Sequence, residues 1–352
     1  MERHRDRSLF LNSLINDSSC IKLLSQFPST TAAHVTTLYT GEEVGQHGVY
    51  EWTYYEKRVD EVICALMFSY GDDAVAESNR PETLKEAGIL PEKVLPEGRF
   101  LERLEKKGIL TAYYCPEDFV NSSYNKRVCE HATPIAYKKL KDGLDNLAEL
   151  NEQIKDMSFI SFYYPGIDSV SHEFGPSSAE NRKEIDAFLN ALEGFLVKIR
   201  RMSDDTLILI TADHGQIDVD PKETIYIDKR LPELSTWLVR NKQGKLLVPC
   251  GGERDLFLHV KPEYLDQASE ILKSKLGEEA LVIKTSDLIE EGFFGKQDCS
   301  DIFLRNVGNI LVLPNEMKCV GWHENGRYGC HHRGVHGGLH EQEMEIPFIA
   351  LL

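Results

Sequence analysis

Three short segments of the chain combine carboxylate and imidazole side chains in patterns that could hold metal ions. Asp168 and His172 stand four residues apart, which places both side chains on the same face of one helical turn. Asp213 and His214 are adjacent and precede a glycine, and His336 begins a His-Gly-Gly turn. The glycines of that turn permit a close approach to a ligand. Because Asp and His bind Zn²⁺ and Mn²⁺ well, the three segments indicate a divalent-metal site.

Each segment also has an ordinary structural interpretation. Asp168 is then a surface acid near an unrelated histidine, Asp213 caps the next helix, and His336 lies on a solvated turn. Asp213 favours the metal interpretation most, because a charge at the end of a buried strand needs a partner. All three segments follow predicted strands, and ligands of open α/β sheets bind outside the carboxyl ends of the strands. We therefore expect the three segments to converge in space.

A fourth segment supplies a hydroxyl group. It reads Phe-Pro-Ser-Thr-Thr and ends at Thr31, directly before a predicted helix over residues 32–38. A hydroxyl at this position is most often only a helix cap. The N-terminus of a helix also favours a phosphate, because its free N–H groups and its dipole attract negative charge there. A metal-bound threonine hydroxyl at such a place could act as a nucleophile.

The elements that must position these residues alternate between helices and nearly all-apolar strands. Strands are predicted at residues 109–115, 158–164, 206–211 and 346–352. Helices are predicted at residues 9–23, 32–38, 100–107, 135–155 and 179–202. This alternation favours an α/β fold, with a mostly parallel sheet flanked by helices on both faces.

The pattern changes after residue 220. A strand at 255–260, a helix at 262–276 and a strand at 280–284 form a small βαβ-like block. A chain of 352 residues is long enough for one large domain with an insertion. We expect residues 1–220 and 326–352 to form the catalytic core and residues 221–325 to form a smaller α+β insertion that caps the site.

Composition excludes several functions. The formal net charge is −17, so the field of the whole protein does not attract nucleic acid or an anionic membrane, and a phosphate substrate needs local positive charge. No apolar run is long enough to cross a bilayer, and no signal-like segment follows the charged residues 1–7. The eight cysteines include no Cys-x-x-Cys pair, which favours reduced thiols. These features predict a cytoplasmic protein, unless the natural chain begins upstream of Met1; none indicates an oligomeric state.

Taken together, the four segments resemble the alkaline phosphatase superfamily, and within it the nucleotide pyrophosphatase/phosphodiesterase family, also called type I phosphodiesterases. The Pro-Thr-x-Thr-type turn, Thr-Gly and His-Gly of that family correspond to residues 28–31, 40–41 and 47–48. Its Asp-x-x-Gly-His-x-x-Gly-Pro corresponds to residues 168–176, with Ser171 in place of the first glycine. Its Thr-Ala-Asp-His-Gly and His-Gly-Gly appear unchanged at residues 211–215 and 336–338.

The resemblance implies a role for each matching residue. Thr31 would be the nucleophile of a hydrolase that cleaves phosphodiester or pyrophosphate bonds through a phospho-threonine intermediate. One divalent ion would be held by Asp168, His172 and His336, and a second by Asp213, His214 and Thr31. Two such ions can stabilise the attacking and the leaving oxygen of an in-line displacement. The implied cofactors are two Zn²⁺ or Mn²⁺ ions, and the implied substrate is a small phosphorylated molecule such as a nucleotide.

The chain departs from the family pattern at two points. The family's second ion has a further Asp ligand, in an Asp-Gly at the end of the first strand, and no such strand or Asp-Gly precedes Leu9. That strand is therefore expected to be absent, and Asp6, Asp17 and His4 are the nearby candidates for the ligand's place. Where the family has a phosphate-contacting Asn, this chain has Trp52, which could stack on an aromatic leaving group, although such residues most often belong to the core.

Three alternatives remain open at this level. A phosphomonoesterase or phosphomutase of the same superfamily is one, and Thr31 argues mildly against it because many of those enzymes use serine. A non-catalytic or truncated relative that binds a phosphorylated ligand is another. Finally, Cys330, His331 and His332 could form a separate metal site, but they lack a fourth ligand at suitable spacing, so a solvated loop is the preferred interpretation.

Overall fold

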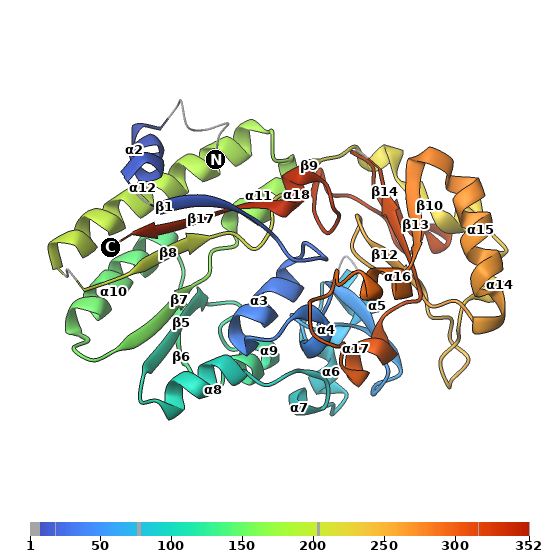
Figure 1. Ribbon diagram of the computed structural model, residues 1–352, viewed down its shortest axis with the longest axis horizontal. Helices are drawn as coiled ribbons and strands as arrows, with labels where there is room; N and C mark the ends of the chain where they lie inside the picture. Colours follow the sequence, from blue (N-terminus) through green and yellow to red (C-terminus); the bar gives the residue numbers. More distant parts are fainter. Residues whose placement is uncertain (1–7, 18, 76–78, 203–204, 316, 352) are drawn as a thin grey trace.

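The computed structural model describes residues 8–17, 19–75, 79–202, 205–315 and 317–351. Two three-stranded sheets and the helices on both of their sides form the part of the fold that positions the site (Figure 1). The helices of this part are α2, α3, α8, α9, α10, α11 and α12, with the bounds Leu9–Asp17, Thr31–Thr40, Arg99–Lys106, Ser123–Val128, Leu140–Gln153, Gly166–Phe174 and Ala179–Met202. The expected α/β class is confirmed.

The first sheet is parallel and has the strand order β6-β5-β7, with the bounds Thr133–Tyr137, Leu110–Pro116 and Ser158–Phe162. Alternate side chains of β5 point to opposite faces, as the two-residue period of a strand requires. Tyr113 packs into a core shared with α3 and α9, whereas Tyr114 stacks on Phe162 of β7, with ring centroids 5.4 Å apart. Both faces of this sheet are therefore covered.

The second sheet is antiparallel and has the order β1-β17-β8, with the bounds Ser19–Leu24, Glu345–Leu351 and Ile208–Thr211. Helix α12 runs along it (Figure 1) and joins α2 and α10 in one apolar cluster, which also takes in Phe162 of β7 and Ile210 of β8. Among the described residues, β7 and β8 each pair on one side only. The shared cluster under both sheets brings the carboxyl ends of β7 and β8 to the same region.

Two sequence predictions about local structure are wrong in part. The expected helix over residues 9–23 ends at Asp17, and the next residues form β1, paired with β17 in the register Ile21↔Phe348. The expected helix over residues 135–155 begins only at Leu140, because Thr133–Tyr137 pairs with β5 instead. In both places an apolar run that suits either element joins a neighbouring strand, so tertiary pairing decides the outcome.

Residues 221–325 contribute a four-stranded sheet of order β11-β12-β14-β13, with the bounds Cys250–Gly251, Leu256–Leu258, Ile310–Pro314 and Ala280–Lys284. One face packs on α15 (Leu265–Leu276) in a core of its own. The other face joins the main core through Phe257, whose ring centroid lies 5.0 Å from that of Tyr50. The sheet therefore packs firmly on the rest of the protein, and the division at residues 220 and 326 stays a prediction.

The remaining elements are short. Those before β5 are α4, β2, β3, β4, α5, α6 and α7, with the bounds Val44–His47, Thr53–Glu56, Glu61–Cys64, Ser69–Tyr70, Gly71–Val75, Thr83–Glu86 and Pro91–Val94. Those after β8 are β9, η1, β10, α13, α14, η2, η3, α16, α17, β15, η4, β16 and α18, with the bounds Ile217–Asp218, Pro221–Glu223, Ile225–Tyr226, Ile227–Arg230, Leu234–Trp237, Pro262–Tyr264, Gly277–Glu279, Thr285–Glu290, Asp301–Asn306, Val320–Gly321, Glu324–Gly326, Gly334–Val335 and Glu341–Met344.

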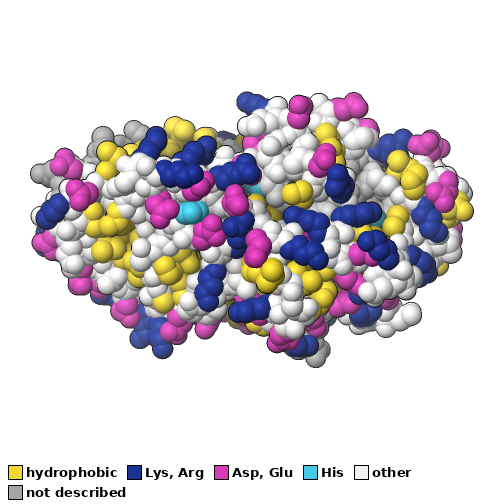
Figure 2. All heavy atoms as spheres, turned by 90° about the horizontal axis from the view of Figure 1, so that it is seen from below, with side chains coloured by type: hydrophobic (Ala, Val, Ile, Leu, Met, Phe, Trp, Pro, Cys, Tyr) yellow, Lys and Arg dark blue, Asp and Glu magenta, His cyan; other side chains and the backbone are white. Residues whose placement is uncertain are grey.

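Figure 2 shows basic and acidic side chains interspersed over one face of the molecule. A mixed surface of this kind on a chain with a net charge of −17 gives a phosphate no broad basic patch on that face. Within the described parts of the chain, no helix combines the length and the apolar character needed to cross a membrane.

Candidate metal centre

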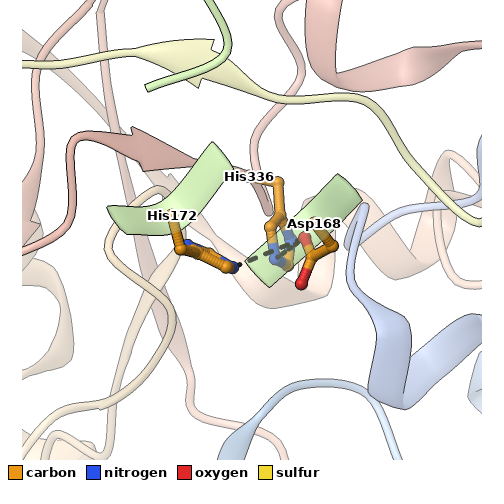
Figure 3. A group of neighbouring side chains, drawn as sticks. All are labelled: Asp168, His172 and His336. Carbon is orange, nitrogen blue, oxygen red and sulfur yellow. Dashed lines mark ion pairs between the residues drawn. The ribbon is translucent and has the colours of Figure 1, made fainter. Parts of the chain in front are cut away.

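Three of the predicted ligands meet in one group. Asp168 and His172 lie on α11, which follows β7, and His336 lies directly after β16. Their ligand atoms all lie within 4.8 Å of one another, and Figure 3 shows the three side chains pointing together. Oδ1 of Asp168 is 3.5 Å from Nε2 of His172 and 3.8 Å from Nε2 of His336. Among the described residues, this is the one group of three or more acids, histidines or cysteines that could hold a metal ion.

A glycine allows the two parts of this group to approach. A side chain at Gly334 would place its Cβ 2.3 Å from the backbone carbonyl oxygen of Ser171 on α11, which no residue other than glycine tolerates. Next to it, the N–H of Arg333 donates to the carbonyl of His172 at 2.8 Å. Strand β16 is thus fastened against α11, and this contact brings His336 beside a helix that lies far from it in sequence.

Hydrogen bonds fix which nitrogen of each histidine is free. Nδ1 of His172 lies 2.8 Å from the carbonyl oxygen of Gly334, and Nδ1 of His336 lies 2.9 Å from that of Ser29. A carbonyl oxygen can only accept, so each Nδ1 carries the proton and each Nε2 keeps its lone pair. Metal-binding histidines are oriented in this way by acceptors behind them. The donor atoms of the group therefore suit a divalent ion.

The remaining predicted ligands form a second group after β8. Nε2 of His214 lies 3.5 Å from the carboxylate of Asp213 and 2.9 Å from Oγ1 of Thr31. The side chains of Asp213 and of Tyr163, which follows β7, also interact with Thr31 electrostatically. Nδ1 of His214 lies 3.0 Å from the carbonyl oxygen of Gly215, which leaves its Nε2 as the nitrogen that faces Thr31. Thr31 thus lies in direct contact with His214 and close to Asp213.

The two groups are neighbours. The rings of His214 and His336 stack with centroids 3.6 Å apart. Burial, followed by the nearby His214 and His172, lowers the pKa of His336 well below its usual value. Burial also acts against the charged form of His214, but the carboxylates of Asp213 and Asp168 outweigh it and raise the pKa of His214. One imidazole of the stacked pair is therefore kept neutral and ready to bind a metal.

Thr31 is the first residue of α3, and Thr30 is its N-cap. The side chain of Thr30 makes no capping bond, and Gly41 closes the helix with a φ of 69°. The helix predicted over residues 32–38 is confirmed, and it begins one residue earlier and ends two residues later. The first N–H groups of this ten-residue helix point toward the region of the two ligand groups, and a helix N-terminus favours a phosphate there.

The three residues considered for the missing carboxylate stay predictions. His4 and Asp6 lie outside the described residues, and Asp17 is the last residue of α2. A further imidazole near the second group is that of His34 on α3, whose Nε2 lies 2.7 Å from Oγ of Ser25. The hydroxyl of Ser25 in turn donates to the carbonyl of Asp213 at 2.8 Å. His34 therefore braces the turn that carries Asp213.

The aromatic residues near His47-Gly48 divide into two kinds. Tyr54 and Tyr55 are buried, and the ring of Tyr54 lies 5.2 Å from that of Tyr50, so both belong to the core. Trp52 is 37% exposed. Its backbone N–H donates to the carboxylate of Glu51. The exposed ring leaves Trp52 available for a ligand, and its predicted role stays a prediction.

Sequence reasoning missed a buried pair of acids beside the centre. The carboxyl groups of Glu51 and Asp255 are fully buried and interact with one another, and burial favours their protonated forms. A Cβ on Gly337 would lie 2.5 Å from Oδ1 of Asp255 and 3.5 Å from Oε1 of Glu51. The pair therefore lies directly beneath the turn that carries His336. Burial is the main cause that raises the pKa of both acids, that of Glu51 to about 7.

We expect Glu51→Gln to change the pH dependence of stability in the metal-free protein. The folded protein keeps a proton on Glu51 up to about pH 7, whereas the unfolded chain loses it near pH 4.5, so the parent loses stability as the pH rises between these values. The glutamine variant lacks this loss, and its free energy of unfolding relative to the parent should rise by about 3 kcal/mol between pH 4.5 and pH 8. Urea unfolding in the presence of a chelator measures the difference. Parallel curves for parent and variant would contradict the assignment, and Glu92→Gln on the surface is the control.

A second expected effect concerns Gly215, which ends the Thr-Ala-Asp-His-Gly segment. Its N–H donates to the carbonyl of Glu343 at 2.8 Å, and a Cβ would lie 2.1 Å from the carbonyl oxygen of Gln342. Gly215→Ala should therefore destabilise the fold by about 1–3 kcal/mol through backbone displacement. Gly194→Ala is the matched control, because no atom lies within 4 Å of its added Cβ on α12 and alanine should stabilise that helix by about 1 kcal/mol. Thermal and urea unfolding of both variants check the opposite signs.

The fold and the two ligand groups at the strand ends define an alkaline-phosphatase-like protein. Residues 1–339 match the family described as type I phosphodiesterase/nucleotide pyrophosphatase, and the chain belongs to this family. The mouse ectonucleotide pyrophosphatase/phosphodiesterase family member 7 is 31% identical over 77 residues, and the rat protein is 30% identical over 77 residues. Each alignment covers 21% of this chain and 17% of the relative.

Solved structures share the fold over nearly the whole chain. Murine ectonucleotide pyrophosphatase/phosphodiesterase 5, in an inactive threonine-to-alanine form in complex with AMP, superposes with a TM-score of 0.69 at 14% identity, over 98% of this chain and 82% of that one. Phosphonoacetate hydrolase from Sinorhizobium meliloti 1021, in complex with phosphonoacetate, gives a TM-score of 0.64 at 15% identity, over 97% and 83% of the two chains. At these identities, the likeness shows a common fold.

Proposed function

We propose that this chain is a metal-dependent hydrolase that cleaves phosphodiester or pyrophosphate bonds through a phospho-threonine intermediate. The observation that carries this proposal is the position of Thr31 at the start of a helix, where its Oγ1 lies 2.9 Å from Nε2 of His214 and close to Asp213. A nucleophilic hydroxyl needs such neighbours to activate it. Family membership, and the AMP and phosphonoacetate bound by the two structural relatives, support a small phosphorylated substrate.

The donor atoms described above would hold two divalent ions. Asp168, His172 and His336 suit one ion, and Asp213, His214 and Thr31 suit a second. Bound there, divalent ions would activate the hydroxyl and stabilise charge on the attacking and leaving oxygens. Three histidine nitrogens among the donors favour Zn²⁺, with Mn²⁺ as the alternative.

The protein's own residues would carry the rest of the reaction. Oγ1 of Thr31 forms the bond to phosphorus while the bond to the leaving group breaks on the opposite side. The hydroxyl proton has an acceptor within reach, because Nε2 of His214 lies 2.9 Å from Oγ1 of Thr31. The N–H groups of the first turn of α3 would bind the phosphoryl oxygens. Water then cleaves the phospho-threonine and restores the hydroxyl.

Residues around the two metal-ligand groups would select the substrate. The exposed ring of Trp52 would stack on an aromatic part of the substrate. Residues 221–325 would cap the site, and their segment between β11 and β12 already reaches it through Glu253 and Asp255.

Hydrolysis of two chromogenic esters tests the proposal. The protein is stripped with a chelator, reloaded with Zn²⁺ or Mn²⁺, and assayed with bis(p-nitrophenyl) phosphate and p-nitrophenyl phosphate. We expect metal-dependent cleavage, with the diester as the better substrate. Faster cleavage of the monoester would indicate a phosphomonoesterase instead. A folded, metal-loaded protein that cleaves neither of the two esters, and that also does not cleave the pyrophosphate bonds of nucleotides, would indicate a non-catalytic relative.

A further inference from the structure

His332 lies beside the first ligand group, although the sequence places it in a loop without an evident role. Its ring centroid is 4.6 Å from that of His172, at an angle of 49°. It also interacts electrostatically with Asp168 and His336, the other two members of that group. The loop is held in place, because the N–H of the next residue, Arg333, donates to the carbonyl of His172 at 2.8 Å.

The neighbours of His332 in sequence do not share this position. The N–H of Cys330 donates to the hydroxyl of Tyr226, and its Sγ lies beside Gly321, so Cys330 faces the two-stranded sheet β10-β15. His331 is exposed and lines a surface pocket of about 480 Å³ together with Arg333 and Phe174. The three residues Cys330, His331 and His332 therefore do not form a metal site of their own, and His332 alone turns toward the predicted ligands.

The orientation of the His332 ring matches that of the predicted ligands. Its Nδ1 lies 3.1 Å from Oε2 of Glu253, which can only accept when ionised, so Nδ1 carries a proton and the lone pair of the neutral ring is on Nε2. His172 and His336 show the same arrangement, with a backbone carbonyl behind Nδ1. A carboxylate behind the far nitrogen of a histidine is a common support for a metal ligand, because it fixes the ring and raises its basicity.

His332 is more exposed than the predicted ligands beside it. Its side chain is 53% exposed, against 25% for His172 and 13% for His336. It lies outside the group whose ligand atoms are all within 4.8 Å of one another, so its side chain must turn toward the group to bind the same ion. A catalytic zinc ion keeps three protein ligands and one exchangeable position. An exposed histidine beside the group is suited to occupy that position and to leave it.

We propose that His332, positioned by Glu253, is a displaceable fourth ligand of the ion held by Asp168, His172 and His336. In the absence of substrate, its Nε2 fills the exchangeable position, and an incoming phosphoryl oxygen replaces it. The bond broken is that between the ion and Nε2, and the bond formed is that between the ion and the phosphoryl oxygen, with no transfer of a proton or an electron. This inference rests on the metal-binding part of the proposed function and adds competition between His332 and the substrate.

Cobalt provides a test that does not depend on activity. The chelated protein is titrated with Co²⁺, and the affinity and the visible spectrum, whose intensity reports the number of ligands, are compared for the parent, His332→Ala and Glu253→Gln. We expect His332→Ala to weaken the binding of one Co²⁺ ion by about 10–100-fold and to change the intensity of the visible Co²⁺ spectrum. Glu253→Gln should have the same two effects, but smaller ones. Inorganic phosphate should change the parent's spectrum toward that of His332→Ala, and it should bind more tightly to the variant.

Two controls separate this role from a structural one. His331→Ala removes the adjacent exposed histidine, and His131→Ala removes one that also pairs with a glutamate, Glu105 at 2.8 Å, at a distant surface. Neither should alter the affinity or the spectrum. If the parent binds Co²⁺ and His332→Ala binds it with the same affinity and spectrum, or binds phosphate more weakly, the inference is wrong while the metal site stands. If the parent binds no Co²⁺, the metal-binding part of the proposed function itself fails.

Discussion

Thr31→Ala is expected to lower kcat for bis(p-nitrophenyl) phosphate at least about 1,000-fold, because it removes the atom that bonds to phosphorus. The rest of the centre should stay in place. Thr30 remains the N-cap of α3, and alanine is a good helix former at the first position of the helix. The KM should change far less than kcat, since the N–H groups at the start of α3 remain. Steady-state kinetics with saturating Zn²⁺, and circular dichroism to verify the fold, measure both parts of this expectation.

The proposed phospho-threonine intermediate can be tested directly. Acid quenching during turnover should trap a phosphoryl group on the peptide that contains Thr31, and mass spectrometry should find it in the parent and not in the alanine variant. Thr31→Ser keeps a hydroxyl and should retain measurable activity. Thr37→Ala removes a threonine from the same helix, where Oγ1 contacts His47 at 3.0 Å, and serves as the control. Full activity of Thr31→Ala would show that another group or water attacks the phosphorus.

The parts of the site that the sequence predicts are those with local causes. Asp168 and His172 share a face because helical geometry brings residues four apart together, and α12 begins and ends at Ala179 and Met202, as its long amphipathic pattern predicts. Thr31 was placed at the start of a helix because a polar turn precedes an apolar run and Gly41 closes it. In each case the signal and the structure that it specifies lie within a few residues of one another.

The parts that the sequence does not predict depend on pairing between distant segments. Residues 19–24 and 133–137 suit a helix as well as a strand, and only the neighbouring strands β17 and β5 decide between the two. The Glu51–Asp255 pair and the Glu253–His332 bond likewise join segments that no local pattern connects. The sequence does not show that Glu51 and Asp255 are buried. Both become buried only when the four-stranded sheet of residues 250–314 packs on β2.

If the protein binds two divalent ions as proposed, Asp168→Asn is expected to remove one of them and most of the activity. Oδ1 of Asp168 lies close to Nε2 of both His172 and His336, so this carboxylate is the single negative charge in the first ligand group. An amide keeps the size of the side chain but supplies no charge to balance a divalent cation, and amides are poor ligands for Zn²⁺. The metal content should fall from about two ions to about one per chain after dialysis, and kcat/KM for the diester should fall at least about 1,000-fold.

The two ligand groups also predict which metal ion each variant loses and whether excess Zn²⁺ restores it. The ligands of the second ion, Asp213, His214 and Thr31, are unchanged in Asp168→Asn, so the ion that remains should still be lost when His214 is also replaced. Asp218→Asn is the matched control, because Asp218 lies near α11 but bonds to Ser177 at 2.5 Å and belongs to neither group. Elemental analysis of the dialysed proteins gives the number of ions, and titration with excess Zn²⁺ shows whether activity returns as the site refills. Two ions per chain and full activity in Asp168→Asn would refute the assignment of the first group, whereas recovery only at high Zn²⁺ would show that Asp168 acts by holding the ion in place.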